Sequence, residues 1–300
     1  MSIEYLAPLS RAFARMKTIL FTPFDLGKWF ALGFTAFLAH LTDSNGGGGG
    51  RGGAPHDVDW DWFFNLPDFL SVWIAEHQVW VALIGAGLIL ILGLVVVLIW
   101  LSSRGTFMFL DNVVHNRSLI VRPWQEHAHH GDTLFLWRFA LTFFSLFLFL
   151  EFLVVGFFTA RSIYFHPDHV SSKILTLAGL AFLGLACFLI LLFISKLLID
   201  FVAPIMYRDN ISVIDAWQKF LHLFSDHPFA FILYTLFSIG LHILVVIIIA
   251  IGGLITCCLG FVLLIIPYIG SVLLLPVTVT FRAFSLEFLE QFGEEFTIFP

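Results

Sequence analysis

Residues 200–218, DFVAPIMYRDNISVIDAWQ, lie between two long apolar runs and have an earlier counterpart in the chain. Both copies contain Asn-x-Ser, two aliphatic residues and then Trp-Gln, with Trp217 in this copy and Trp124 in the earlier one. From these tryptophans onward the copies align without a gap at an offset of 93 residues. Further identical pairs are Gln125/Gln218, His129/His222, Thr142/Thr235 and Ser145/Ser238. The pattern predicts a duplicated unit of membrane helix, interfacial connector and membrane helix, over residues about 79–158 and again about 174–251.

The composition predicts that the solvent of this chain is largely lipid. It has 59% hydrophobic residues, 37 Phe and only 12% charged residues, whereas ordinary soluble domains have about 25% charged residues. A water-soluble core cannot hide so much apolar surface. The net charge of −6 and the lack of a basic stripe argue against nucleic-acid binding. We expect an all-α, polytopic integral membrane bundle that forms one domain over residues 1–300.

Six apolar segments are long enough, or nearly so, to cross a membrane as helices. We expect these membrane helices over residues 26–41, 79–101, 134–158, 174–199, 229–251 and 259–279. Pro267 and Pro276 interrupt the sixth segment and predict a kink or a half-helix, because neighbouring helices can satisfy the carbonyl groups that a proline frees. The rest of the region 259–300 is expected to form an amphipathic tail, mainly over residues 281–292.

The first residues of the chain, 3–20, have the pattern of an amphipathic helix. Its apolar residues recur at spacings of three and four, and they are Leu6, Leu9, Phe13, Met16 and Leu20. Arg11, Arg15 and Lys17 fall largely off that face, as in a helix that lies in the membrane surface with its cations toward anionic headgroups. The alternative is a plain amphipathic helix packed on the protein, and we favour the membrane surface.

Residues 44–56 form a glycine-rich loop with five consecutive glycines, expected on the external side. This loop lacks the lysine and the Ser or Thr of a phosphate-binding loop, so we exclude nucleotide binding. Asp57, Asp59 and Asp61 follow, interleaved with tryptophan. An interfacial belt explains this pattern better than a cation site, because the glycine and closing glutamate of a calcium loop are not in place.

The distribution of positive charge predicts the orientation. With six spans, 12 of the 15 Lys and Arg residues fall on the side that holds both termini and both connectors. The positive-inside rule then places both termini and the connectors in the cytoplasm. We expect a multi-pass protein of a prokaryotic inner membrane.

Glu151 and His242 form the candidate intramembrane polar site. Glu151 is a carboxylate deep in one expected span, and the duplication places His242 at a similar depth in another. A charge near the bilayer centre costs roughly 2.5–3.5 kcal/mol on insertion scales, so Glu151 should face protein or water, or be protonated. The pair would relay a proton or hold a substrate, or it would form a packing hydrogen bond. We favour the packing interpretation.

The connectors carry a cluster of six histidines: His115, His127, His129, His130, His222 and His227. Zinc is one possibility, but no Cys or H-E-x-x-H pattern accompanies them, and we favour solvated interfacial histidines. Trp124 and Trp217 are expected to anchor the two connectors at the inner headgroup level. The sequence shows no nucleophile elbow and no pair of carboxylates in a soluble cleft, so we expect neither an enzyme nor a cofactor or metal.

The connector resembles that of a prokaryotic membrane family. The residues that carry the resemblance are Ala203-Pro204-Ile205-Met206, Asn210, Ser212 and Ala216-Trp217-Gln218. That family includes uncharacterised six-helix proteins and the membrane domain attached to some glycerophosphodiester phosphodiesterases. The catalytic phosphodiesterase domain is absent, so the resemblance implies a stand-alone membrane protein without a defined activity.

Two functions are compatible with these features. The first is a non-catalytic membrane protein that organises lipids or partner proteins, or a second copy of itself, through its cytoplasmic interfacial helices. The second is a small transporter or channel that uses Glu151 and His242. We favour the first, because a water-filled path needs more polar lining than these spans supply.

Overall fold

The computed structural model describes residues 3–42, 60–166, 170–256 and 259–299, and these residues form helices and no strand. The glycine-rich loop 44–56, Asp57 and Asp59 lie outside the described residues. The α-helices are α1 (Leu6–Phe21), α2 (Leu26–Ala39), α3 (Trp60–Phe64), α4 (Leu66–Glu76), α5 (Gln78–Val114), α6 (Val121–Glu126), α7 (Ala128–Phe165), α8 (Val170–Leu197), α9 (Ala203–Asp209), α10 (Val213–Asp226), α11 (Pro228–Ile255), α12 (Leu259–Ile265), α13 (Pro267–Leu273) and α14 (Leu275–Leu289). A π-helix, η1 (Leu198–Val202), joins α8 to α9, and two short 3₁₀ segments, η2 (Glu290–Phe292) and η3 (Glu294–Phe296), follow α14.

Four helices are long and apolar enough to cross a membrane, and a fifth candidate is a bent pair. The four are Gln78–Val114, Ala128–Phe165, Val170–Asp209 and Pro228–Ile255. The bent pair comprises α13 and α14 with η2, whose axes differ by 63°. The break before Pro267 and the bend at α14, which carries Pro276 in its first turn, confirm the predicted interruption. The first expected span forms as α2, a helix of only 14 residues.

The chain divides into two compact units, of residues 1–43, 99–142 and 190–300 and of residues 44–98 and 143–189. The first unit has an aromatic core whose rings come from four helices. Phe201 of η1 stacks on Phe220 of α10, with the ring centroids 5.6 Å apart, and Tyr234 of α11 contacts Phe288 of α14 at 4.6 Å. All four side chains are essentially inaccessible, so this unit has the packed interior of a globular domain.

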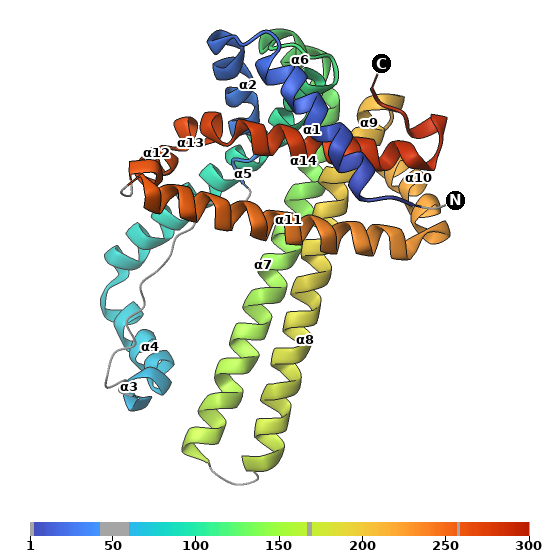
Figure 1. Ribbon diagram of the computed structural model, residues 1–300. Coiled ribbons are helices and arrows are strands. Elements are labelled where there is room, and N and C mark those ends of the chain that lie inside the picture. Colours follow the sequence, from blue (N-terminus) through green and yellow to red (C-terminus); the bar gives the residue numbers. More distant parts are fainter. Residues whose placement is uncertain (1–2, 43–59, 167–169, 257–258, 300) are drawn as a thin grey trace. The chain divides into compact units, whose positions relative to one another are not determined.

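Within this unit, α1 lies along α14 (Figure 1). Its buried residues are Pro8, Ala12, Met16, Ile19 and Leu20. Of the predicted apolar face, Leu6 and Phe13 remain exposed, and Arg11 and Arg15 point to Glu287 of α14. The assignment of these two cations to lipid headgroups is therefore corrected: a buried carboxylate attracts them instead. Whether the outer face of α1 meets lipid stays a prediction.

The expected tail forms the second half of α14 and η2. Every residue from Arg282 to Leu289 in α14 is buried. Further along, Arg208 holds the last described residues by donating from Nε to the Thr297 carbonyl at 2.7 Å and from Nη2 to the Glu294 carbonyl at 2.9 Å. The amphipathic pattern thus reflects packing between α1 and the core.

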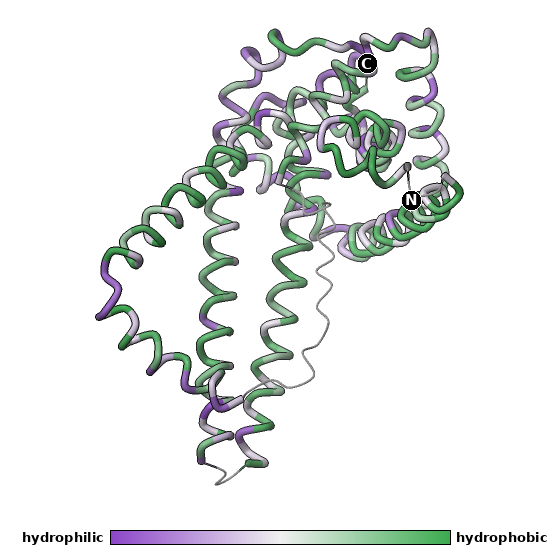
Figure 2. The backbone as a smooth tube through the Cα atoms, turned by 90° about the vertical axis from the view of Figure 1, so that its left-hand side faces the viewer, coloured by the Kyte–Doolittle hydropathy of each residue, from purple (hydrophilic) through white to green (hydrophobic). Residues whose placement is uncertain are grey.

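The second unit holds α3, α4 and the adjoining parts of α5, α7 and α8. Its long helices are predominantly hydrophobic (Figure 2), and most of their large apolar side chains are exposed. Polar contacts gather near their ends: Arg161 pairs with Asp68 at 2.6 Å, and Tyr164 donates to Asp61 at 2.7 Å. Exposed apolar helices with polar ends are typical of segments surrounded by lipid.

Candidate functional site: a buried carboxylate between the two connectors

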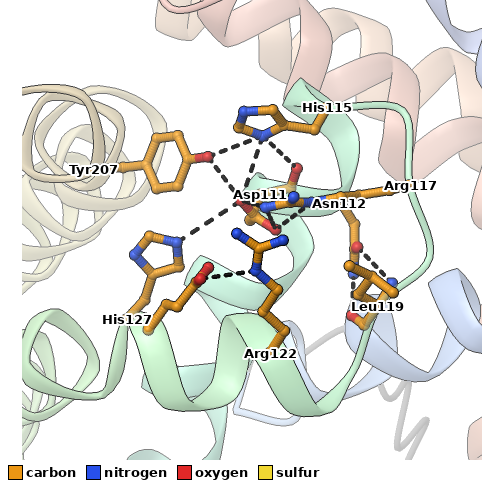
Figure 3. Close-up of polar contacts among 9 residues, drawn as sticks. Asp111, Asn112, His115, Arg117, Leu119, Arg122, His127 and Tyr207 are labelled. Carbon is orange, nitrogen blue, oxygen red and sulfur yellow. Dashed lines mark hydrogen bonds and ion pairs between the residues drawn. The ribbon is translucent and has the colours of Figure 1, made fainter.

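Asp111, in the last turn of α5, is the centre of a polar network in the first unit (Figure 3). Its side chain is 1% exposed. Removing a carboxylate from water costs several kcal/mol, roughly, unless cations and hydrogen bonds compensate. The surroundings of Asp111 supply both.

Two groups hold the carboxylate directly. Arg117 donates from Nε to Oδ2 at 3.0 Å and from Nη2 to Oδ1 at 2.7 Å, the fork geometry that makes arginine–carboxylate pairs strong. Tyr207 of α9 donates its hydroxyl to Oδ1 at 2.8 Å. The hydrogen bond to Asp111 raises the pKa of Arg117, so this guanidinium stays charged.

Two histidines lie next to the same carboxylate oxygen. The Nδ1 atom of His115 is 3.3 Å from Oδ1, and the Nε2 atom of His127 is 3.7 Å from it. His115 Nδ1 is also 3.2 Å from the Tyr207 hydroxyl. Among the described residues, no group of His, Cys, Asp and Glu is placed to bind a metal ion.

Local structure explains why Arg117 reaches back to Asp111. After α5 ends, Asn116 takes the left-handed conformation with φ of 50°, which reverses the chain. Asn112 then fixes the loop, since its side chain both donates to the Leu119 carbonyl and accepts from the Leu119 amide, each at 2.8 Å. Asparagine tolerates this left-handed region better than most residues.

The network joins the two predicted connectors. Asp111, Arg117 and His127 belong to the first, and Tyr207 lies just before Asn210 in the second. The carboxylate already accepts from an arginine and a tyrosine, so it is poorly placed to take a proton from a substrate. By binding Arg117 and Tyr207 together, the Asp111 carboxylate links the two connectors to each other.

A second buried carboxylate is used in the same way. Glu287 of α14 is 1% exposed and accepts from Arg11 at 2.5 Å and from Arg15. The Arg15 guanidinium also lies 3.6 Å from the centroid of the Phe299 ring. Both buried carboxylates in the described part of the chain therefore join segments far apart in sequence.

Glu151 and His242 fall in different units, so their pairing stays a prediction. Glu151 is exposed on α7. His242 of α11 donates from Nδ1 to the Ser238 carbonyl at 2.7 Å, and its ring stacks on Phe281 with the ring centroids 3.8 Å apart. His242 thus has packing partners of its own.

Trp124 and Trp217 are both half-buried, but their neighbours differ. Trp124 meets Trp100 edge to face at 5.7 Å, and the Arg104 guanidinium lies 5.1 Å from its ring. The Trp217 ring centroid is 6.0 Å from that of Trp137. Their role as membrane anchors stays a prediction.

Lys196 and Asp200 take part in a polar cluster that the sequence patterns do not predict. Their ion pair is present at 2.9 Å, and Tyr234, buried in α11, also donates to Asp200 at 3.2 Å. Asp200 lies in η1, and π-helical turns are frequent at functional sites. The signal in the sequence was Pro204, four residues later.

Comparison with known proteins assigns the chain to a family. Residues 5–289 match the model described as "Family of unknown function (DUF7544)". The chain belongs to this family. The match agrees with the expectation of an uncharacterised family, and nothing in it links DUF7544 to the membrane domain of glycerophosphodiester phosphodiesterases. No curated protein and no solved structure matches the chain.

Proposed function

We propose that this protein is a non-catalytic, multi-pass component of a prokaryotic cell membrane that holds lipids or partner proteins against its two cytoplasmic connectors. The observation that carries the proposal is the Asp111 network, which joins the connectors to each other. Each connector also carries an exposed aliphatic side chain. Val121 at the start of α6 is 68% exposed, and Ile214 in the first turn of α10 is 59% exposed. Exposed aliphatic residues on short helices with charged neighbours are typical of membrane or protein contacts.

The proposal includes the duplicated unit. Asn116 and Asn210 support it, because these equivalent residues are the two non-glycine residues with positive φ in the described part of the chain. In each copy a connector helix begins within five residues of this turn. Six crossings are proposed as well, with the short α2 as the first and the broken segment α12–α14 as the last.

The experiment is site-specific photocrosslinking in intact cells. A photoreactive amino acid replaces Val121 or Ile214, and exposed Glu294 serves as the matched position outside the connectors. We expect lipid or protein adducts from the first two positions, identified by mass spectrometry, and fewer from position 294. Equal labelling at all three positions would contradict the proposal.

A transporter is the second candidate, and the Asp200 cluster is the observation that favours it. Asp200 lies within a π-helix, pairs with Lys196 and accepts from Tyr234, so it supplies polar groups within an apolar segment. Ion flux into liposomes, measured for the wild type and for Asp200→Asn, Glu151→Gln and His242→Ala, tests it. Flux that any of these variants abolishes at unchanged thermal stability would favour transport over the organising function.

A further inference from the structure

We propose that the α1–α2 corner, residues 17–30, binds an anionic phospholipid. This inference rests on the proposed function and deepens it, because it names a lipid class and a surface on α1 and α2, which meets the first connector where Lys28 donates to Asn116. Four apolar side chains of the corner are between 47% and 61% exposed: Phe21, Phe24, Leu26 and Phe30. Water is a poor environment for so many neighbouring apolar groups, and an aromatic cluster of this kind fits the headgroup level of a bilayer.

The aromatic side chains of the corner are held by their own contacts. The ring centroids of Phe21 and Phe24 are 6.4 Å apart, and Trp29 meets each of them edge to face, at 5.6 and 5.8 Å. The Trp29 indole donates to the Leu20 carbonyl at 2.8 Å, which fixes this ring against the end of α1. The cluster is therefore preorganised and loses little side-chain freedom when it enters lipid.

Charge identifies the lipid class. The corner contains two cations, Lys17 and Lys28, and one acid. That acid, Asp25, caps α2 by accepting from the Gly27 amide at 2.8 Å. Asp25 acts electrostatically on Lys28, and the corner keeps a net charge of +1. Lysines beside an apolar insertion surface attract anionic headgroups.

The structure also places one of these cations. Lys28 Nζ donates to the Asn116 side chain at 2.7 Å, which leaves its remaining hydrogens for a phosphate. The Lys17 ammonium lies 4.7 Å from the centroid of the exposed Phe13 ring. A headgroup phosphate would pair with Lys28, and Lys17 would add positive charge to the corner, while the acyl chains contact Phe24 and Leu26.

The test is a lipid titration of the full-length protein in neutral detergent, read by native mass spectrometry. We expect phosphatidylglycerol to bind the wild type more tightly than phosphatidylcholine. The double variant Lys17→Gln/Lys28→Gln should bind phosphatidylglycerol about thirtyfold more weakly, as expected for two lysines at an anionic surface. Phosphatidylcholine binding should change little, and Phe24→Ser should weaken both lipids.

Controls separate the lysine charges from folding and from other cations. Lys17→Arg/Lys28→Arg keeps both charges and should retain the preference. Lys173→Gln removes one charge from the second unit, where Lys173 Nζ donates to the His166 carbonyl at 2.7 Å. This variant should leave the preference for phosphatidylglycerol unchanged. Soluble glycerol phosphate lacks acyl chains and should not compete.

Two results would overturn the inference: equal phosphatidylglycerol affinity in the wild type and the glutamine variant, or full competition by glycerol phosphate. Photocrosslinks at Ile214 do not depend on the corner. A failure of this inference would appear in the lipid titration, and a failure of the proposed function would appear in the photocrosslinking, so the two can be told apart.

Discussion

At the scale of single residues, buried charge is used for cross-linking. Asp111 and Glu287 are both 1% exposed. Asp111 accepts from Arg117 in the loop after α5 and from Tyr207 of α9, and Glu287 accepts from two arginines of α1. A carboxylate buried without partners is costly, so each site needs all of its donors present together. These two acids therefore report on whether the surrounding segments are assembled.

Asp111→Asn is expected to destabilise the protein. The amide keeps the shape but cannot accept from all the donors, and it leaves the Arg117 guanidinium without its carboxylate. Loss of hydrogen bonds to a charged group costs on the order of 2 kcal/mol. Thermal unfolding of the wild type and the variant in the same detergent measures this loss of stability. Glu126→Gln, which breaks the exposed pair with Arg122, is the matched control, and a similar loss there would contradict the assignment.

Glu287→Gln tests the clamp on α1. We expect α1 to separate from α14 more easily, because Arg11 and Arg15 lose the charge that draws them inward. Limited proteolysis should then cleave α1 sooner than in the wild type. Cleavage at the wild-type rate would mean that the apolar face of α1 holds it without the ion pairs.

At the scale of elements, η1 has an identifiable cause. In a π-helix each carbonyl accepts from the amide five residues later, as Leu198 does from Ala203. The corresponding partner of Ile199 is Pro204, which has no amide hydrogen. Arg282 of α14, only 5% exposed, donates to the Ile199 carbonyl at 2.8 Å instead. Arg282 thus supplies the hydrogen bond that Pro204 cannot donate to the Ile199 carbonyl.

A double-mutant cycle tests this coupling. Arg282→Met leaves the Ile199 carbonyl unpaired and should cost about 1–3 kcal/mol. In a Pro204→Ala background the new amide can pair with that carbonyl, so the cost of Arg282→Met should fall. Free energies of unfolding of the four proteins measure the difference. Equal costs in both backgrounds would show that Arg282 acts through other contacts.

The left-handed turns make a further prediction at this scale. Asn116→Gly and Asn210→Gly should be tolerated, whereas the valine variants should each cost roughly 1–2 kcal/mol, because a branched side chain clashes with the backbone at positive φ. Asn65, with φ of −88°, is the control whose valine variant lacks this penalty. Thermal unfolding compares the five variants.

At the scale of the whole molecule, the distribution of Lys and Arg predicts the topology. Cysteine labelling in intact cells should place residues 60–75 and 160–166 outside and residues 115–120, 210–225 and both termini inside. The native cysteines are first replaced, so that single introduced cysteines are read. Labelling of position 120 from outside would overturn the six-crossing arrangement.

The sequence by itself determined the helical class, the apolar runs and the interrupted end of the chain. These depend on local quantities: hydropathy summed over a window, and the missing amide hydrogen of Pro267 and Pro276. The sequence also aligned Asn116 with Asn210, and both residues have a positive φ. The duplicated unit itself stays a prediction.

Only the tertiary structure decided which polar residues meet. Arg11 and Arg15 look like headgroup contacts until Glu287, more than 270 residues away, is placed beside them. Asp111 looks like one acid near a helix end until Arg117, Tyr207 and the histidines surround it. A periodic pattern shows which face of a helix is apolar, but it does not show whether lipid or another helix covers that face. The partner of a buried charge is set by packing between residues far apart in the sequence. Hydropathy averaged over neighbouring residues holds no information about such contacts.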